Sequence, residues 1–212
     1  MNKYKIISLV LAISLIASLV RLVYLTSSRT DTSTQVPSAE TVLHNILNRK
    51  SVRSYTDREV SRAQLDTLTR AAMAAPTGRD MRPWKFVTID DKKVLVKLAE
   101  KLPRAKMLTE AKAAIVVCGD LGVTDDQGKP SVNWTLDCSA ATENLLLQAE
   151  AMGLGAVWIG VYPYEDRMPG VSEVLGLPDP IKPLNVVAIG YPKGNPQPKD
   201  KYDAGNIHYN QW

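Results

Sequence analysis

Hydrophobic and polar positions divide the chain into an apolar N-terminal run, a short polar stretch and a long region of alternating patterns. Residues 6–25 are apolar apart from serines and one arginine, whereas residues 26–37 show no apolar repeat. The remaining sequence alternates between helical spacing of apolar residues and short apolar runs typical of buried strands. The pattern therefore predicts an N-terminal membrane anchor or signal segment over 1–25, a flexible polar linker over 26–37 and a folded domain over 38–212.

Four segments of the folded domain have the spacing of amphipathic helices. Ser61 and Gln64 form a capping box, in which each side chain accepts a hydrogen bond from a backbone N–H at the helix start. Gly153 ends the longest segment, as glycine does at many helix C-termini. The predicted helices follow Ser38 and Ser61 and cover residues 91–102 and 136–152.

Four short apolar runs predict strands of a buried sheet. The residues after Pro192 are rich in proline and tyrosine but poor in core residues, so we expect them to lie over another surface. Helices and strands in this order predict an α+β domain with a central sheet surrounded by helices. The predicted strands are residues 85–89, 113–119, 157–161 and 185–190.

Charge and composition exclude two classes of function. The formal net charge is +4, but residues 1–36 carry four basic residues against one acidic residue, so the rest of the chain is near +1. A nucleic-acid-binding domain needs a basic face, so we expect no nucleic-acid partner. Two histidines and two cysteines, without a CxxC or HExxH motif, do not supply the ligands of a metal site, so none is expected.

The apolar run over residues 6–25 is long enough to cross a membrane as a helix of about 30 Å. A signal peptide that is cleaved on export is the alternative, because a charged start and an apolar centre fit both. We favour a single-pass N-terminal anchor, since Thr26–Ser28 is only a fair cleavage site and no pair of alanines follows the apolar run. Lys3 and Lys5 favour a cytoplasmic N-terminus, which places the folded domain outside the cytoplasm.

The segment after the first predicted helix carries two arginines and a serine. Arg49 and Arg53 are four residues apart, with Ser51 between them. Guanidinium groups form two-pronged hydrogen bonds with phosphate oxygens, so two of them and a hydroxyl within one turn suit a phosphate or another oxyanion. A solvated helix end whose cations complement the helix dipole is the alternative interpretation. Lys199 and Lys201 add two cations in the C-terminal segment.

Two turns that contain proline are further candidates for ligand binding. The loop over residues 75–84 joins a helix to a strand, and we expect it to place Thr77, Asp80 and Arg82 at the edge of the sheet. The second turn follows the predicted strand at 157–161 and contains Pro163. We expect the backbone amides of the next three residues, Tyr164 to Asp166, to face a ligand.

In this order and spacing the segments closely resemble the FMN-dependent nitroreductase family over residues 40–212. The family usually carries an asparagine that contacts the flavin where this chain has Asp80. An ionised acid cannot donate a hydrogen bond, so we expect this difference to affect the choice of substrate more than flavin binding. The matched residues are Arg49, Ser51 and Arg53; Ala75, Pro76, Thr77, Arg82, Pro83, Trp84 and Phe86; Asp137, Ala141, Asn144, Leu147 and Ala149; and residues 153–160.

The resemblance implies a nitroreductase-like α+β fold with a central mixed sheet surrounded by helices. It also implies a homodimer with a swapped C-terminal tail that binds FMN between its subunits. It implies ping-pong transfer of hydride from NAD(P)H, or from another donor, to a small acceptor such as a nitroaromatic or a quinone. The chemistry takes place at flavin N5, without a catalytic side chain. The residues implied in FMN binding are Arg49, Lys50, Ser51, Arg53, Pro76, Thr77, Asp80, Arg82, Pro163, Tyr164, Glu165, Lys199 and Lys201.

Within this set, the resemblance implies that Arg49, Ser51, Lys199 and Lys201 bind the phosphate and that Arg53 lies near the pyrimidine edge of the flavin. Two alternatives to a nitroreductase remain. One is a specialised relative, such as a dehalogenase or a dehydrogenase of a small molecule. The other is a membrane-tethered flavin-binding protein without turnover, which the addition of NAD(P)H under anaerobic conditions distinguishes.

Overall fold

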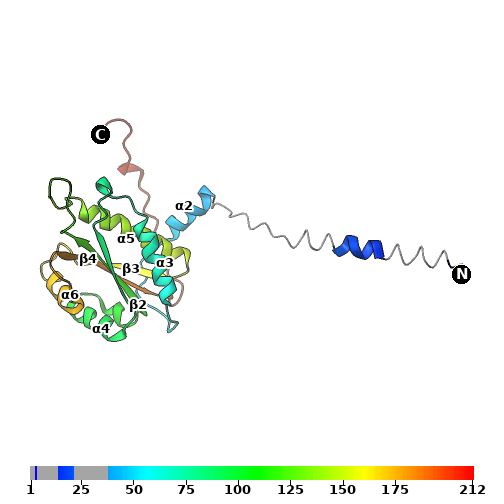
Figure 1. Ribbon diagram of the computed structural model, residues 1–212, viewed down its shortest axis with the longest axis horizontal. Helices are drawn as coiled ribbons and strands as arrows, with labels where there is room; N and C mark the ends of the chain where they lie inside the picture. The colour runs from blue at the N-terminus through cyan, green and yellow to red at the C-terminus, as the bar shows by residue number, and fades with distance from the viewer. Residues whose placement is uncertain (1–2, 4–13, 22–37) are drawn as a thin grey trace. The chain divides into compact units, whose positions relative to one another are not determined.

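The computed structural model describes residue 3, residues 14–21 and residues 38–212. The chain divides into a smaller unit, residues 1–40, and a larger unit, residues 41–212, and the larger one is compact. The larger unit has three layers, with a β-sheet between two layers of helices (Figure 1). This is the α+β arrangement that the sequence predicts.

The sheet has four strands in the order β1-β2-β4-β3, and each of its three pairings is antiparallel. The prediction of a mixed sheet is therefore corrected, because among the described residues the parallel pairing is an isolated bridge between Ser51 and Ala156. All four predicted strands are present. Their bounds are Trp84–Ile89 for β1, Ala113–Asp120 for β2, Gly155–Gly160 for β3 and Ile181–Gly190 for β4.

Helices α3 (Arg62–Met73) and α5 (Trp134–Ala151) cover one face of the sheet (Figure 1). The predicted capping box at the start of α3 is confirmed, since Ser61 accepts from the Gln64 amide and the Gln64 side chain accepts from the Ser61 amide. Burial of each leucine or valine side chain contributes about 1.5–3 kcal/mol to the folding of this layer. Its buried residues include Leu65, Leu68, Ile115, Leu145 and Val187.

Helices α4 (Lys92–Lys101) and α6 (Met168–Leu175) cover the opposite face. The sequence pattern did not predict α6, because Pro169 and Gly170 break the helical spacing at its start. Proline is tolerated in the first turn of a helix, where its missing N–H has no partner to lose. Three short 3₁₀ helices complete the unit, at Gly78–Asp80, Lys106–Thr109 and Ala204–Asn206.

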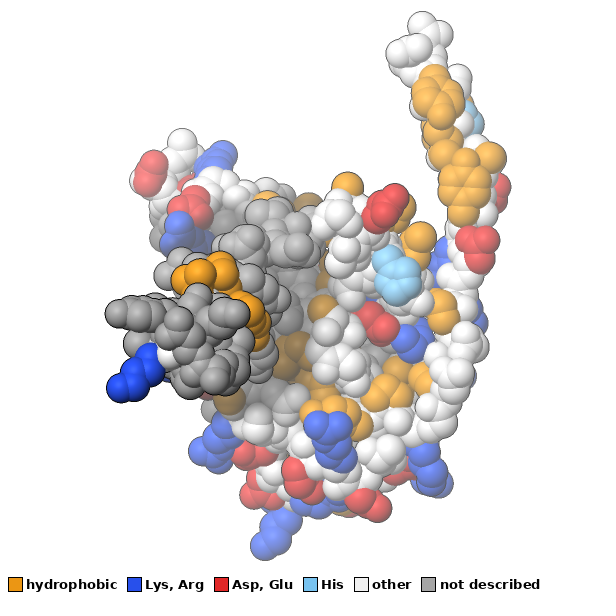
Figure 2. Space-filling view, turned by 90° about the vertical axis from the view of Figure 1, so that its right-hand side faces the viewer, with side chains coloured by type: hydrophobic (Ala, Val, Ile, Leu, Met, Phe, Trp, Pro, Cys, Tyr) orange, Lys and Arg blue, Asp and Glu red, His pale blue; other side chains and the backbone are white. Residues whose placement is uncertain are grey.

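Two segments of the larger unit expose apolar side chains. Helix α2 (Ala39–Asn48) has no buried residue, although its spacing gives it one apolar face. The C-terminal segment extends from the body with hydrophobic side chains along it (Figures 1 and 2), and Trp212 is fully exposed. The exposed apolar residues of the two segments are Val42, Leu43, Ile46, Leu47, Tyr202, Ile207, Tyr209 and Trp212.

The membrane anchor predicted over residues 6–25 is corrected by the structure. Residues 14–21 of this run are helical, and the rest of it lies outside the described residues. In the part of the chain that the structure describes, no helix combines the length and the apolar character needed to cross a membrane. This finding overturns the single-pass anchor and the extracytoplasmic location that depended on it. The linker predicted over 26–37 also lies outside the described residues.

Candidate functional site

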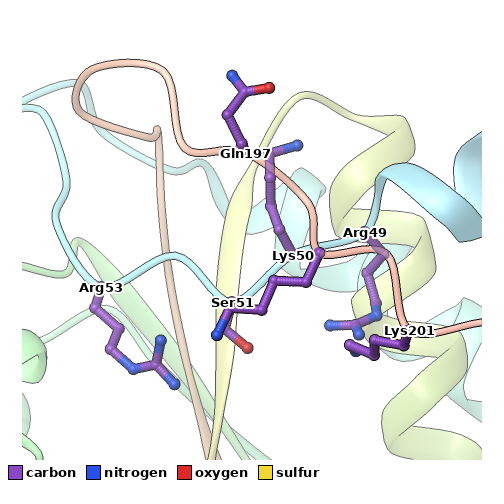
Figure 3. Close-up of a pocket in the computed structure, with 7 residues that line it drawn as sticks. Arg49, Lys50, Ser51, Arg53, Gln197 and Lys201 are labelled. Atoms are coloured by element: carbon purple, nitrogen blue, oxygen red, sulfur yellow. The ribbon is translucent and has the colours of Figure 1, made fainter.

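A basic hollow of about 240 Å³ lies where the segment after α2 meets the C-terminal segment (Figure 3). Five of its seven lining residues are lysines or arginines, and none is acidic, so the hollow favours an anionic ligand. Six of the seven are labelled in the figure. The lining residues are Arg49, Lys50, Ser51, Arg53, Gln197, Lys199 and Lys201.

An extended backbone places Ser51 and Arg53 at this hollow. Helix α2 ends at Asn48, and residue 51 already pairs with Ala156 in a parallel bridge. Side chains alternate along an extended chain, so Val52 is buried while the residues on either side of it are exposed. The predicted placement within one turn is therefore corrected, because it is the period of two that brings the side chains to one face.

A close backbone contact holds this extended segment against β3. The Val52 amide donates to the Ala156 carbonyl at 3.0 Å. A Cβ atom on Gly155 would lie 2.7 Å from the Val52 side chain, so a larger residue at position 155 would displace the segment. Glycine at this position thus permits the approach that forms one wall of the hollow.

The C-terminal segment reaches the hollow because its beginning runs beside residues 54–56. The Thr56 amide donates to the Tyr191 carbonyl at 2.9 Å, and the Lys193 amide donates to the Ser54 carbonyl at 3.0 Å. These backbone contacts fix the direction in which the chain continues. They explain how cations from two distant parts of the sequence line one hollow.

The cations of the hollow differ in how far they are already neutralised. Lys50 forms a half-buried ion pair with Glu150 at 2.7 Å, and Arg49 Nε lies 3.2 Å from the exposed carboxylate of Glu143. Arg53, Lys199 and Lys201 form no ion pair with any described residue. We therefore expect Lys50 to contribute least to the binding of an anion.

The loop that contains Pro76 and Thr77 is anchored by a buried carboxylate from α5. Asp137 accepts a hydrogen bond from Thr77 Oγ1 at 3.0 Å and another from the Gly78 amide at 3.0 Å. Arg82 donates two hydrogen bonds to the carboxylate of Asp80, and both side chains are exposed. The loop therefore presents a fixed ion pair to solvent.

Three residues of this loop adopt left-handed backbone conformations that favour glycine. The φ angles are 54° at Arg79, 55° at Asp80 and 48° at Arg82. Such conformations cost free energy at residues with a side chain, and they persist where neighbouring contacts hold them. The bonds to Asp137 supply those contacts, so the loop is held in shape rather than left to relax.

The turn after β3 offers fewer backbone amides than the sequence predicts. The Tyr164 amide donates to the Val161 carbonyl at 3.0 Å and is not available to a ligand, which corrects the prediction for that residue. The amides of Glu165 and Asp166 have no acceptor among the described residues. Arg167 holds the turn by two contacts. Its Nη1 donates to the Gly160 carbonyl at 2.8 Å, and its guanidinium lies 3.8 Å from the centre of the Tyr164 ring.

The model of the nitroreductase family matches residues 46–105 and 99–191. The chain belongs to the nitroreductase family. The match includes the segment after α2, the loop before β1 and the turn after β3, and it ends before the C-terminal lysines of the basic hollow.

Three relatives support the nitroreductase fold along most of the chain. A crystal structure from Parabacteroides distasonis, provisionally named NADH dehydrogenase/NAD(P)H nitroreductase, is 54% identical, covers 81% of this chain and 98% of its own, and has a TM-score of 0.76. A Methanothermobacter thermautotrophicus protein with the same provisional name is 40% identical over 81% of this chain and 87% of its own length. An FMN-dependent nitroreductase from Clostridium difficile R20291 is 28% identical, with a TM-score of 0.72 over 80% of this chain and 99% of its own.

The nitroreductase domain brings together only part of the predicted site. Arg49, Lys50, Ser51, Arg53, Lys199 and Lys201 all line one hollow, together with Gln197. Neither the loop residues Pro76, Thr77, Asp80 and Arg82 nor the turn residues Pro163, Tyr164 and Glu165 line it.

Three residues at the site were missed in the sequence. Gln197 lines the hollow, Asp137 anchors the loop and Arg167 supports the turn. Asp137 belongs to the helix motif that resembles the family, but its role follows only from the fold, because its partners are about sixty residues away. The Arg167 Nε is buried without a hydrogen-bond partner, a feature that no sequence pattern reveals.

Replacing Asp137 by asparagine is expected to destabilise the nitroreductase domain. The amide retains one acceptor oxygen, so one of the two donors, Thr77 Oγ1 or the Gly78 N–H, loses its partner. An unsatisfied buried donor costs about 1–3 kcal/mol, which corresponds to a fall in Tm of several degrees. Thermal unfolding followed by circular dichroism measures this fall. Thr77→Val removes the bond to Asp137 and also the bond that Thr77 Oγ1 accepts from the Arg82 amide, so it should lower the Tm as well. Equal Tm values for all three proteins would contradict the anchoring role.

Proposed function

We propose that the protein is an FMN-dependent oxidoreductase that takes hydride from NAD(P)H and passes it to a small acceptor such as a nitroaromatic or a quinone. The basic hollow carries this proposal, because it brings the Arg49–Arg53 segment, which resembles the family, together with the lysines of the C-terminal segment in one basic surface that suits an anion. The names of the relatives agree with it: the Clostridium difficile protein is described as FMN-dependent, and the Methanothermobacter protein is named for NAD(P)H.

The residues of the hollow fit the phosphate of FMN. A phosphate monoester carries nearly two negative charges at neutral pH, and Arg49, Lys199 and Lys201 supply compensating cations. Ser51 adds a hydroxyl donor from the same extended segment. Arg53 lies on the same wall, and we assign it to the pyrimidine edge of the flavin, where a cation favours the reduced form.

The loop and the turn are proposed to contact the flavin ring. Pro76, Thr77 and Arg82 belong to the loop that Asp137 fixes, and the Glu165 amide is a donor without an acceptor among the described residues. When bound, FMN supplies an acceptor and donor of hydride at N5. The chain supplies position, charge and exclusion of water, and the proposal requires no side chain to act as an acid or a base.

Asp80 is proposed to influence which acceptor binds. The hydrogen bonds from Arg82 hold the pKa of Asp80 below its ordinary value, so the carboxylate remains charged at neutral pH. It therefore accepts hydrogen bonds but does not donate them, unlike the asparagine that the family usually carries. Hydride acceptors that carry a hydrogen-bond donor facing Asp80 are therefore expected to bind best.

A homodimer is proposed from the exposed apolar surface. Ile46 and Leu47 of α2 and Tyr202 of the C-terminal segment line a hollow of about 660 Å³ beside the basic one. A monomer rarely leaves a contiguous apolar patch of this kind uncovered. Because the loop and the turn do not line the basic hollow, a second subunit that supplies them would complete the site, with the C-terminal segment packed across the partner.

Residues 38–212 are expected to purify as a yellow protein with one FMN per subunit. Addition of NADH or NADPH without oxygen should bleach the flavin absorbance, and a nitroaromatic or a quinone should restore it. Anaerobic absorbance spectra measure both steps. Absence of flavin after reconstitution with excess FMN would contradict the cofactor assignment, whereas bound flavin that neither coenzyme bleaches would favour a binding protein without turnover.

A further inference from the structure

A second polar hollow, of about 230 Å³, lies at the loop that Asp137 anchors. Gly78, Arg79 and Met81 of the loop form one wall, and a hairpin over residues 124–130 and the start of α5 form the rest. None of its lining residues lines the basic hollow. The two hollows are thus separate surfaces, and the family resemblance assigns nothing to the second one.

One acidic residue organises the hairpin, and its charge is already compensated. The Asp125 carboxylate accepts from the Gln127 amide at 3.0 Å, from the Lys129 amide at 2.9 Å and from Arg79 Nη1 at 3.0 Å. These donors lower the pKa of Asp125, the Lys129 amide most of all. The Lys129 ammonium forms no ion pair with any described residue. The balance of charge at the hollow is therefore positive.

A largely buried serine whose hydroxyl has no partner among the described residues also lines this hollow. Ser131 is only 6% exposed, and its side chain makes no hydrogen bond to a described residue. Its Oγ is not one of the fully buried unpaired atoms of the described residues, so it remains accessible from the hollow, where a ligand or a water molecule can satisfy it. The side-chain amide of Asn133, which also lines the hollow, has no hydrogen-bond partner in the described chain.

The first turn of α5 adds to the same electrostatic character. Asn133 is the N-cap of this 18-residue helix, and its side chain makes no capping bond. The amides of Thr135 and Leu136 have no acceptor among the described residues. A helix N-terminus carries a partial positive charge that favours anions. Cation, hydroxyl, amide and helix end together form a set of donors that matches an oxyanion.

We propose that this hollow binds the anionic group, a carboxylate or a phosphate, of a substrate of the enzyme. The inference rests on the proposed function, because Gly78–Met81 belong to the loop that is assigned to the flavin ring. A substrate whose reacting end lies at the flavin can then extend its charged end past Arg79 toward Lys129 and Ser131. The preferred substrates are therefore acidic, and the anion belongs either to the acceptor or to the nicotinamide donor.

Two variants of the full-length, FMN-loaded protein test the proposal. Lys129→Gln removes the unpaired cation, and Ser131→Ala removes a hydroxyl that makes no bond within the described chain, so neither should disturb the fold. The KM for 4-nitrobenzoate should rise about three- to tenfold in each variant, while the KM for 4-nitrobenzyl alcohol stays constant. Lys97→Gln, an exposed lysine of α4, is the matched control.

The donor arm of the experiment distinguishes the two sources of the anion. A rise in the KM for NADH or NADPH, with 4-nitrobenzoate unaffected, assigns the hollow to the phosphates of the coenzyme; the reverse assigns it to the acceptor. Calorimetric titration of the oxidised protein with benzoate, or with inorganic phosphate, should show the same loss of affinity without any turnover. Unchanged KM values and unchanged binding in both variants would overturn the proposal. Lack of turnover with every acceptor in the unmodified protein would instead count against the proposed function.

Discussion

Deletion of residues 200–212 is expected to convert a flavin-loaded dimer into a monomer that binds FMN at least tenfold more weakly. The deletion removes Lys201 from the basic hollow, and one charge-assisted contact to phosphate contributes about 1.5–3 kcal/mol, or about 10- to 150-fold in affinity. It also removes the exposed side chains of Tyr202, Ile207, Tyr209 and Trp212, which the proposed partner subunit would cover. Sedimentation velocity and a fluorescence titration with FMN measure the two effects.

A matched variant separates the two causes. Lys201→Gln in the full-length chain should weaken FMN binding while the protein remains a dimer. Because the deleted side chains are largely exposed, the shortened chain should unfold at a similar temperature when FMN is absent. A shortened chain that remains dimeric and retains its affinity for FMN would contradict both the proposed interface and the role of Lys201.

Replacing Arg49 by alanine is expected to weaken FMN binding about 10- to 150-fold. Arg49 is half-buried at the hollow, and its ion pair with Glu143 is open to solvent, so little free energy opposes a change of partner from Glu143 to phosphate. Arg49→Lys keeps the charge but loses the two-pronged geometry and should show an intermediate affinity. Fluorescence titration with FMN gives all three dissociation constants.

Arg53→Ala provides the contrast within the same hollow. If Arg53 lies at the pyrimidine edge, its loss should lower the reduction potential of the bound flavin and slow bleaching by NAD(P)H, with a smaller effect on affinity. Arg62→Ala serves as a control, because Arg62 does not line the hollow and its exposed ion pair with Asp90 is not part of the site. An unchanged affinity for FMN in Arg49→Ala would show that the phosphate assignment is wrong.

Local patterns predicted most of the helices and strands because each is determined by residues close in sequence. The capping box at Ser61 and the apolar run at Ala113 are examples, and both have the predicted structure. The first part of β4 was missed because Pro183 argues against a strand. The structure accommodates it where the register shifts, with Val117 opposite Asn185 and Cys118 opposite Pro183.

The candidate site was predictable where it depends on short-range spacing and not where it depends on the fold. Arg49, Ser51 and Arg53 alternate along the chain, so any extended backbone brings them to one face. The left-handed backbone at Arg79 and Asp80 has no signal in the sequence, since glycine is the residue that normally indicates it. The hydrogen bonds that hold this backbone come from Asp137 and Asp125, which lie far from the loop in the sequence. These bonds form only once the layers of the domain are assembled.

The two buried cysteines allow the stability of each helical layer to be followed separately. Cys118 belongs to the core that α4 and α6 cover, and Cys138 to the core beneath α3 and α5. Burial raises the pKa of each thiol to about 12, so at pH 7 both cysteines are protonated and very little of either is the reactive thiolate. An alkylating reagent therefore modifies either residue only when its layer opens. The labelling rate at Cys118 reports local unfolding on one face of the sheet, and the rate at Cys138 reports it on the other.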